Sequence, residues 1–185
     1  FVRYQHDPND PNSLSNNTIW SLYEDRSGVL WIGTVNGLNK LDLTQKPERF
    51  VRYQHDPNDS YSISHNAIFS IHEDRSGILW IGTEQGLNMY DPHGDTERFV
   101  RYHYDANDPQ SISHNEIYSI YEDRSGALWI GTRGGGLNTF DRNTEQFLHY
   151  RHDSADLHSL SHDTIWDIYE DRSGVLWIGT DGGGL

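Results

Sequence analysis

Short apolar segments alternate with polar turns along the whole chain. Residues 19–23 and 29–34 are rich in β-branched and aromatic side chains, which favours strands. The Asp-Arg-Ser-Gly sequence at residues 25–28 is typical of a turn, because Asp accepts backbone N–H groups and Gly tolerates a positive φ. No apolar period of about 3.6 residues is sustained along the chain, so the pattern predicts hairpins rather than helices.

Two further strands complete this unit. A second turn at Asn36-Gly37 leads into an apolar stretch at residues 38–43, and residues 50–53 form a fourth segment. A long polar loop at residues 55–66 then leads to the next apolar segment. Two tight hairpins and one long connection describe a four-stranded blade and its crossover.

The unit is repeated. The sequence EDRSG-x-LWIGT occurs at residues 24–34, 73–83, 122–132 and 170–180, so it returns after 49, 49 and 48 residues. It divides one propeller region, residues 1–185, into units 1–49, 50–98, 99–146 and 147–185, of which the last is truncated. A β-solenoid is the alternative, but its coils are usually shorter and lack such tight hairpins. The sequence predicts an all-β fold, a β-propeller of four-stranded antiparallel blades with about four blades in this chain.

The repeated residues are predicted to pack the blades. A ring rarely holds identical sites in every blade, whereas packing is identical, so Glu24, Asp25 and Arg26 are interpreted as structural rather than catalytic. The tryptophans are large enough to fill the space between sheets, the aspartates form turns, and the glycines mark close approach of the backbone. The predicted packing residues are Trp31, Trp80, Trp129, Trp177, Asp25, Asp74, Asp123, Asp171, Gly33, Gly82, Gly131 and Gly179.

Composition narrows the classes of function. The chain has no Cys, which excludes disulfides, thiolate nucleophiles and cysteine zinc sites. Its 28 acidic against 14 basic residues give a formal charge of −14, which repels phosphate backbones and anionic lipid. We therefore expect no nucleic-acid partner, and the absence of a long apolar run predicts no membrane contact by this segment.

The repeat resembles a known family. The pattern Ile-x-x-Ile/Leu-x-Glu-Asp-x-x-Gly-x-Leu-Trp-Ile-Gly-Thr-x-x-Gly-Leu-Asn-x-x-Asp is similar to the two-component regulator propeller repeat, and covers residues 19–42, 68–91 and 117–141, with a truncated copy at 165–185. The loop at residues 7–15, with its relatives at 56–64 and 105–113, fits the same family. The resemblance implies a β-propeller from the extracytoplasmic sensor region of a bacterial hybrid histidine kinase or related regulator. Such propellers sense ligands, often glycans.

The number of blades departs from that family. Its rings usually hold about seven blades, whereas four inner hairpins are present here. The chain is therefore expected to be a segment of a longer protein, a recently amplified repeat, or an engineered consensus-like scaffold. It contains no kinase motif.

The two ends of the sequence are offset by one strand. Phe1-Val2-Arg3-Tyr4 matches the outermost strand of a unit, and the chain reaches Leu185 where a third strand would begin. Three arrangements remain open: four blades that close alone, two chains paired head to tail in an eight-bladed ring, or part of a larger ring. We expect self-association, with such a head-to-tail dimer as one form, or a larger ring.

Variable positions near one rim are the candidate ligand-binding residues. One set precedes the innermost strands, and its three His and one Asn could face a common axis: Asn16, His65, His114 and His162. A second set follows the Gly-Thr pair in a hairpin loop: Val35, Glu84, Arg133 and Asp181. Turn capping and surface variation are the simpler interpretations. No metal site is predicted, because a wide channel would separate the ligands.

Two more sets bear on ligand binding. Trp20, Phe69, Tyr118 and Trp166 lie on the innermost strands, where exposed aromatic rings would suit sugar stacking and buried rings would belong to the core. Asp7-Pro8-Asn9-Asp10 has spaced oxygen ligands, but turn formation explains it more simply than calcium.

Catalytic motifs are missing from the sequence. No Gly-x-Ser-x-Gly elbow, phosphate-binding loop or His-Glu-x-x-His pattern is present, and the acids repeat with the blades. The sequence therefore favours a non-enzymatic, sensor-type propeller module that binds a glycan, small molecule or partner, with no cofactor. The alternatives are a purely structural or engineered repeat that oligomerises to close a ring, and a propeller glycan hydrolase or lyase.

Overall fold

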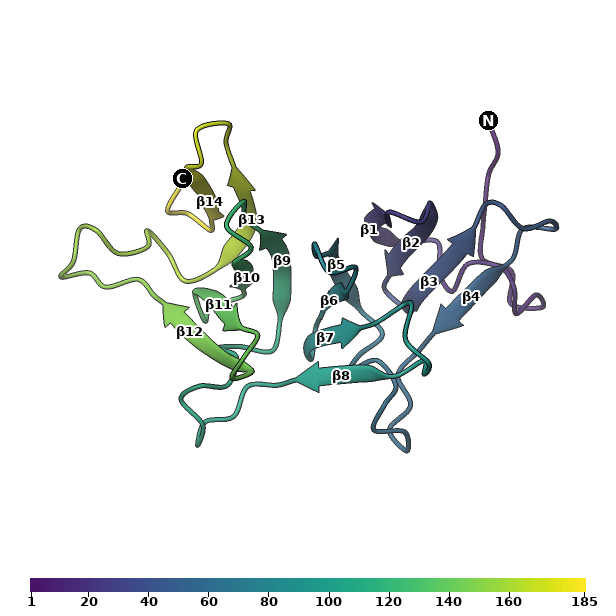
Figure 1. The fold of residues 1–185 in the computed structure, drawn as a ribbon, viewed down its shortest axis with the longest axis horizontal. Helices are drawn as coiled ribbons and strands as arrows, with labels where there is room; N and C mark the ends of the chain where they lie inside the picture. Colours follow the sequence, from purple (N-terminus) through teal and green to yellow (C-terminus); the bar gives the residue numbers. More distant parts are fainter.

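The computed structural model describes residues 1–185 and consists of four antiparallel sheets arranged as blades (Figure 1). The first three sheets are β1 (Ile19–Glu24), β2 (Val29–Thr34), β3 (Gly37–Asp42) and β4 (Phe50–Tyr53); β5 (Ile68–Glu73), β6 (Leu79–Thr83), β7 (Gly86–Tyr90) and β8 (Phe99–Tyr102); β9 (Ile117–Glu122), β10 (Leu128–Thr132), β11 (Leu137–Asp141) and β12 (Gln146–Tyr150). The fourth sheet is the hairpin of β13 (Ile165–Glu170) and β14 (Leu176–Thr180). The predicted all-β propeller fold is confirmed.

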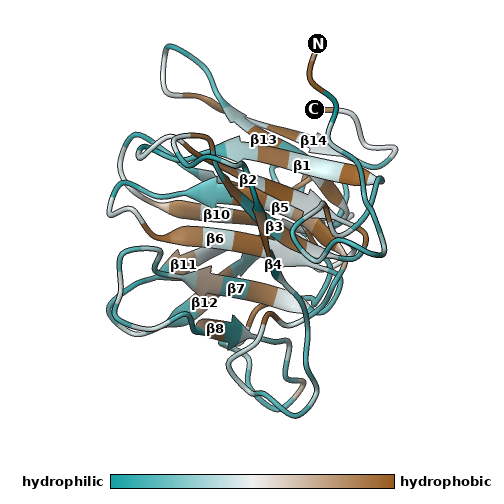
Figure 2. Cartoon of the chain, turned by 90° about the vertical axis from the view of Figure 1, so that its right-hand side faces the viewer, coloured by the Kyte–Doolittle hydropathy of each residue, from teal (hydrophilic) through white to brown (hydrophobic).

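Apolar residues lie mainly on the strands and polar residues on the loops (Figure 2). The structure contains no helix that could cross a membrane. Each strand is hydrogen-bonded to the next along the chain, so a blade is a simple antiparallel meander.

The turn between the first two strands of each blade is held by its aspartate. The Asp25 carboxylate accepts hydrogen bonds from the backbone N–H groups of Ser27 and Val29 and, at 2.8 Å, from the Trp31 indole N–H. Gly28 leaves the turn at φ +82°, which glycine adopts without steric cost. The indole bond recurs from Trp80 to Asp74 at 2.8 Å, from Trp129 to Asp123 at 2.7 Å and from Trp177 to Asp171 at 3.0 Å.

The apolar core lies between blades rather than within them. Trp31, Leu38 and Tyr53 of the first blade pack with buried residues of the second, such as Ile68 and Leu79. Each buried aromatic ring removes a large apolar area from water, so these contacts between blades supply much of the stability of the fold. The same arrangement joins the second blade to the third around Trp80, and the third to the fourth around Leu137.

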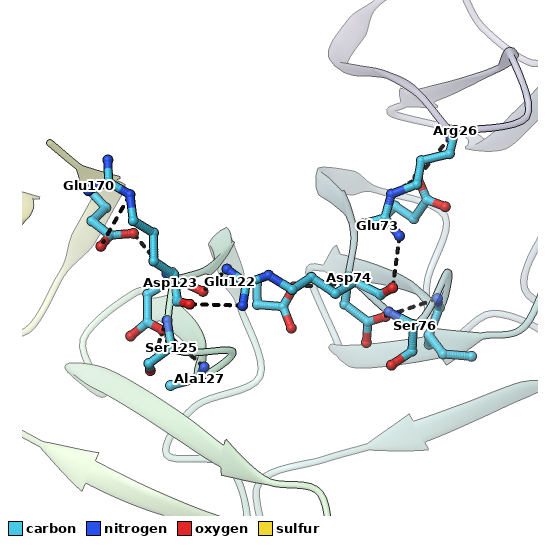
Figure 3. Close-up of polar contacts among 12 residues, drawn as sticks. Arg26, Glu73, Asp74, Ser76, Glu122, Asp123, Ser125, Ala127 and Glu170 are labelled. Carbon is cyan, nitrogen blue, oxygen red and sulfur yellow. Dashed lines mark hydrogen bonds and ion pairs between the residues drawn. The ribbon is translucent and has the colours of Figure 1, made fainter. Parts of the chain in front are cut away.

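A ladder of charged residues crosses the blades near the first turns (Figure 3). The Glu73 carboxylate accepts the backbone N–H of Arg26 at 2.9 Å, and the Arg26 guanidinium donates to the Arg75 carbonyl at 2.8 Å. The next two rungs repeat both contacts, from Arg75 to Glu122 and Arg124, and from Arg124 to Glu170 and Arg172. The repeated Glu and Arg residues therefore connect each blade to its neighbour.

The four blades form an open arc (Figure 1). The innermost strands contact one another in the order β1, β5, β9 and β13, and β1 and β13 lie at the two ends of the arc. A ring closed by four blades alone, one of the arrangements left open by the sequence, is therefore not what this chain adopts. The ends of the arc expose side chains that are buried at the internal joints.

Replacing Asp74 with alanine is expected to destabilise the fold by about 2–4 kcal/mol, because the buried Trp80 indole loses its acceptor and Arg142 loses one of its two ion pairs. Asp171→Ala removes the same group from an exposed hairpin and should cost clearly less. Denaturant unfolding of the two variants measures the difference. Equal losses would contradict the structural role given to the buried aspartate.

Stability should fall in acid. Burial alone would raise the pKa of Asp25, Asp74 and Asp123, but hydrogen bonds outweigh it and hold each pKa below the ordinary 3.8. The donors are the indole and backbone N–H groups in all three, together with a serine hydroxyl for Asp25 and Asp123 and the Arg142 guanidinium for Asp74. A depressed folded-state pKa stabilises the fold above the unfolded value, and this contribution is lost as the pH falls through the folded values. The denaturant concentration at the midpoint of unfolding, measured between about pH 6 and pH 2, should therefore stay constant at first and then fall as the pH is lowered. A midpoint that stays constant below pH 3.8 would contradict this assignment.

Candidate functional site

Four aromatic side chains form a continuous row along the inner strands. Trp20 of β1, Phe69 of β5, Tyr118 of β9 and Trp166 of β13 come from the four successive blades. Ring centroids lie 5.0 Å apart for Trp20 and Phe69, 5.2 Å for Phe69 and Tyr118, and 4.7 Å for Tyr118 and Trp166. The last pair is stacked with only 3° between the ring planes. The four rings alone line a hollow of about 310 Å³.

A β-bulge places each of these rings. The pairing of β1 with β2 shifts register between Ile19 and Ser21, so Trp20 is the extra residue of that strand. The pairings of β5 with β6, β9 with β10 and β13 with β14 shift at the equivalent positions. A bulge redirects the side chain of its extra residue, and bulges are frequent beside functional sites.

The row is open to solvent at its ends. Trp20 is 49% exposed and Trp166 is 53% exposed, while Phe69 and Tyr118 are partly buried between them. Of the two interpretations that the sequence left open, burial of all four rings in the core is therefore excluded. The bulge takes each ring out of the regular alternation of its strand, and the two rings with a blade on both sides are more covered than the two at the ends of the arc.

A polar cluster lies beside the row. The Glu116 carboxylate accepts hydrogen bonds from the Arg133 guanidinium at 3.0 Å and from the Tyr118 hydroxyl at 3.3 Å. Burial, and then the charge of Glu116, raise the pKa of the Tyr118 hydroxyl, which keeps it a donor at neutral pH. On the second blade, His65 Nδ1 lies 3.5 Å from the Glu84 carboxylate.

The second predicted set, in the hairpin loop after the Gly-Thr pair, is fixed next to the aromatic row by backbone hydrogen bonds. Its residues lie just after the second strand of each blade, and their backbone N–H groups donate to the carbonyl of the residue that precedes the innermost strand. These bonds join Val35 to Thr18, Glu84 to Ala67, Arg133 to Glu116 and Asp181 to Thr164 at 3.0–3.3 Å. The set therefore places four different side chains along the rim beside the rings. Whether they bind a ligand stays a prediction.

The first predicted set, which precedes the innermost strands, forms hydrogen bonds within its own turns. Asn16 Oδ1 accepts the Thr18 backbone N–H at 2.8 Å, and the Nδ1 atoms of His65, His114 and His162 accept the equivalent N–H two residues later at 3.0–3.2 Å. These side chains cap their own turns, as Asx residues do. No group of three or more His, Asp or Glu side chains is placed to hold a metal ion.

The Asp-Pro-Asn-Asp loop also uses its oxygen atoms locally. Asp7 Oδ1 accepts the Asn9 backbone N–H at 2.8 Å, and Asp10 Oδ1 accepts that of Asn12 at 2.9 Å. Arg52 then anchors the loop through the carbonyls of Asp10 and Ser13. Turn formation thus accounts for these residues, as the sequence suggested.

The cluster of Glu116, Arg133 and Tyr118 was not found from the sequence as a unit. Arg133 was a candidate and Tyr118 was part of the aromatic set, but Glu116 stands where the other units have Thr18, Ala67 and Thr164. A charged residue at a position that is otherwise small is the signal that could have revealed it. The cluster is specific to one blade, unlike the repeated acids of the turns.

The comparisons with known proteins agree with the fold. A family model for the two component regulator propeller matches residues 13–36, 62–85, 111–134 and 159–182. Comparison with curated protein sequences gives no significant match.

Several solved structures are similar to the chain. The extracellular domain of the putative hybrid two component system BT3049 from B. thetaiotaomicron is 33% identical with a TM-score of 0.77, over 90% of this chain and 22% of that one. The extracellular domain of the putative one component system BT4673 from the same organism is 30% identical with a TM-score of 0.74, over 91% and 21%. PorZ of Porphyromonas gingivalis, a bacterial surface component of the type-IX secretion system, shares the fold at 16% identity and a TM-score of 0.68, over 91% and 26%.

The chain is much shorter than these relatives. It spans about a fifth of the two B. thetaiotaomicron domains that it matches. The family model, by contrast, matches every one of the four blades, and it covers the hairpin that holds the buried tryptophan and aspartate. On these matches, the chain belongs to the two-component regulator propeller family.

Proposed function

We propose that this chain is a non-enzymatic, ligand-binding propeller module from the extracytoplasmic part of a sensor protein. Its family and its two B. thetaiotaomicron relatives, which are extracellular domains of two component and one component systems, support that role. The observation that carries the proposal is the row of four aromatic rings that bulges place on the inner strands.

The ligand class follows from the chemistry of the row. Flat aromatic faces with a rim of hydrogen-bonding side chains suit the apolar faces and hydroxyl groups of sugar rings. The formal charge of −14 disfavours anionic sugars, so a neutral glycan is the expected ligand. Glu116, Arg133 and Tyr118 would orient its hydroxyls, since they are fixed by mutual hydrogen bonds before a ligand arrives.

The absence of catalysis is part of the proposal. The acids of the turns are occupied in the structural bonds to indole and backbone donors, and Glu116 is engaged by Arg133 and Tyr118. A hydrolase would instead need two carboxyl groups free to flank a glycosidic bond.

Isothermal titration calorimetry with neutral xylo-, cello- and arabino-oligosaccharides tests the binding proposal. At least one should bind saturably, and Trp166→Ala should weaken its binding by up to about tenfold, because a stacking ring is worth about 0.5–1.5 kcal/mol. Tyr104→Ala removes an equally exposed ring away from the row and serves as the control.

Two results would contradict the proposal. One is an affinity for the bound oligosaccharide that Trp20→Ala and Trp166→Ala both leave unchanged, which would place the site elsewhere. The other is recovery of shortened or modified oligosaccharide after incubation with the chain, which would show catalysis. Binding without turnover that depends on both tryptophans supports it.

A further inference from the structure

The loop that leads into each complete blade is anchored by a side chain on the fourth strand of the same blade. Arg52 of β4 anchors the loop before β1, and Arg101 of β8 anchors the loop before β5. His149 of β12 takes this place for the loop before β9, residues 105–113. This last loop turns on the outer side of the arc, away from the innermost strands (Figure 1). The third blade therefore holds its loop with a different side chain from the first two.

The arginine of the first two blades donates from both ends of its guanidinium group. Arg52 Nε donates to the Ser13 carbonyl at 2.7 Å, and Nη2 donates to the Asp10 carbonyl at 2.8 Å and to the Ser13 hydroxyl at 2.7 Å. Arg101 makes the equivalent three bonds in the second blade. We call the pair of oxygens that receives Nη2, the aspartate carbonyl and the serine hydroxyl, the cradle.

In the third blade, His149 makes only the first of these bonds. Its Nε2 atom donates to the Ser111 carbonyl at 2.7 Å, and it makes no bond to the Asp108 carbonyl or the Ser111 hydroxyl, the two cradle oxygens of this blade. The loop keeps its shape, because the Ser111 hydroxyl still donates to the Asp108 carbonyl at 2.8 Å, as the equivalent serines do in the first two blades. The cradle is therefore preserved without a guanidinium donor from the chain.

A hollow of about 430 Å³ lies at this point, and its lining includes Asp105, Asp108, His149 and Arg151. Asp105 and Asp108 each accept a backbone N–H through Oδ1, and their Oδ2 atoms make no hydrogen bond within the chain. These two carboxylates and the formal charge of −14 favour a cation in the hollow. Arg151, which forms no ion pair, is the one side chain of the lining whose charge opposes a cation.

The hollow belongs to a complete blade. Its walls come from the loop before β9 and from the end of β12, and all four strands of that sheet are present. The equivalent loop of the second blade, at residues 56–61, is likewise exposed although complete blades lie on both sides of it. The difference between the two loops is therefore the side chain that enters the cradle, Arg101 in one and His149 in the other.

We propose that the hollow beside His149 binds a guanidinium group from outside the chain, which donates to the Asp108 carbonyl and the Ser111 hydroxyl. The group would restore the contacts that Arg52 and Arg101 make in their own blades. A planar guanidinium presents several donors in a fixed geometry, whereas an ammonium group is a strongly hydrated point charge and fits such a cradle less well. This inference goes beyond the sugar-binding proposal and does not depend on it.

NMR titration of the ¹⁵N-labelled chain with the blocked tripeptide Gly-Arg-Gly tests the proposal. The backbone amide signals of residues 105–111 should shift and saturate. The same tripeptide with lysine should bind severalfold more weakly. The tripeptide with citrulline, which keeps the shape of arginine without its charge, should not bind.

Two substitutions in the hollow should change the affinity in opposite directions. His149→Arg supplies the chain's own guanidinium to the cradle and should weaken binding roughly tenfold or more. Arg151→Gln removes the opposing charge and should tighten binding severalfold. His93→Arg adds the same charge as His149→Arg at an exposed turn of the second blade, so it is the matched control and should leave the affinity unchanged.

A third substitution should create a second site. Arg101→His leaves the second blade with the same side chain as the third, so signals of residues 56–62 should then also shift with Gly-Arg-Gly. Thermal unfolding of each variant shows whether it is folded. If Arg101→His does not fold, the comparison of His149→Arg with His93→Arg decides the question.

Three results would overturn the proposal: no saturable shift with Gly-Arg-Gly, equal binding of the citrulline tripeptide, or an affinity that His149→Arg leaves unchanged. Binding that needs the guanidinium and is lost in His149→Arg supports it. Methylguanidine then distinguishes the source of the group. Tighter binding of the tripeptide indicates an arginine of a partner protein, and equal or tighter binding of methylguanidine indicates a small guanidino compound; both results support the site.

Discussion

The hydrogen bond from the second-strand tryptophan to the aspartate of the preceding turn is the interaction on which the architecture depends. A blade in this fold has little core of its own, so its largest side chain must lie between two sheets. A buried indole needs an acceptor for its N–H group, and the turn aspartate supplies one without leaving its hairpin. The same carboxylate fixes the turn, so one residue couples the local hairpin to the packing between blades.

The Trp–Asp hydrogen bond recurs in every blade, so the residues around it are fixed by packing. A binding function is therefore expected at positions outside this repeated contact. Trp31 and Trp80 have equivalent surroundings because each must present the same surface to the next blade. The rim positions Val35, Glu84, Arg133 and Asp181 are not part of this packing, and they differ in charge and size from blade to blade. The bulge on each inner strand allows an aromatic ring to leave the packed layer while its neighbours remain in register. The packing residues and the candidate binding residues are therefore different residues of the same strand.

The fold could be predicted from the sequence because its signals are local and repeated. Strand composition, the Asp-Arg-Ser-Gly turn and the fixed period are each visible in one unit and strengthened by the others. The open arc could not be predicted, since it depends on the angle between successive blades rather than on any single blade. Whether Trp166 and its equivalents are exposed could not be decided from the sequence for a related reason: a bulge is one extra residue in a pairing register, and alternation in sequence does not reveal it. The capping by His65 was foreseen only as the simpler alternative, because Nδ1 can accept a turn N–H as readily as it can bind a ligand.

The aromatic row and the joints between blades are parts of one geometry. Trp20 stacks on Phe69 across the first joint, and Tyr118 stacks on Trp166 across the third, so the row exists only where blades are joined. A ligand that lies along the row would contact both blades of a joint, so it would bind the packed blades more tightly than separated ones. By linkage it would then stabilise the joint by the same free energy that the joint adds to binding.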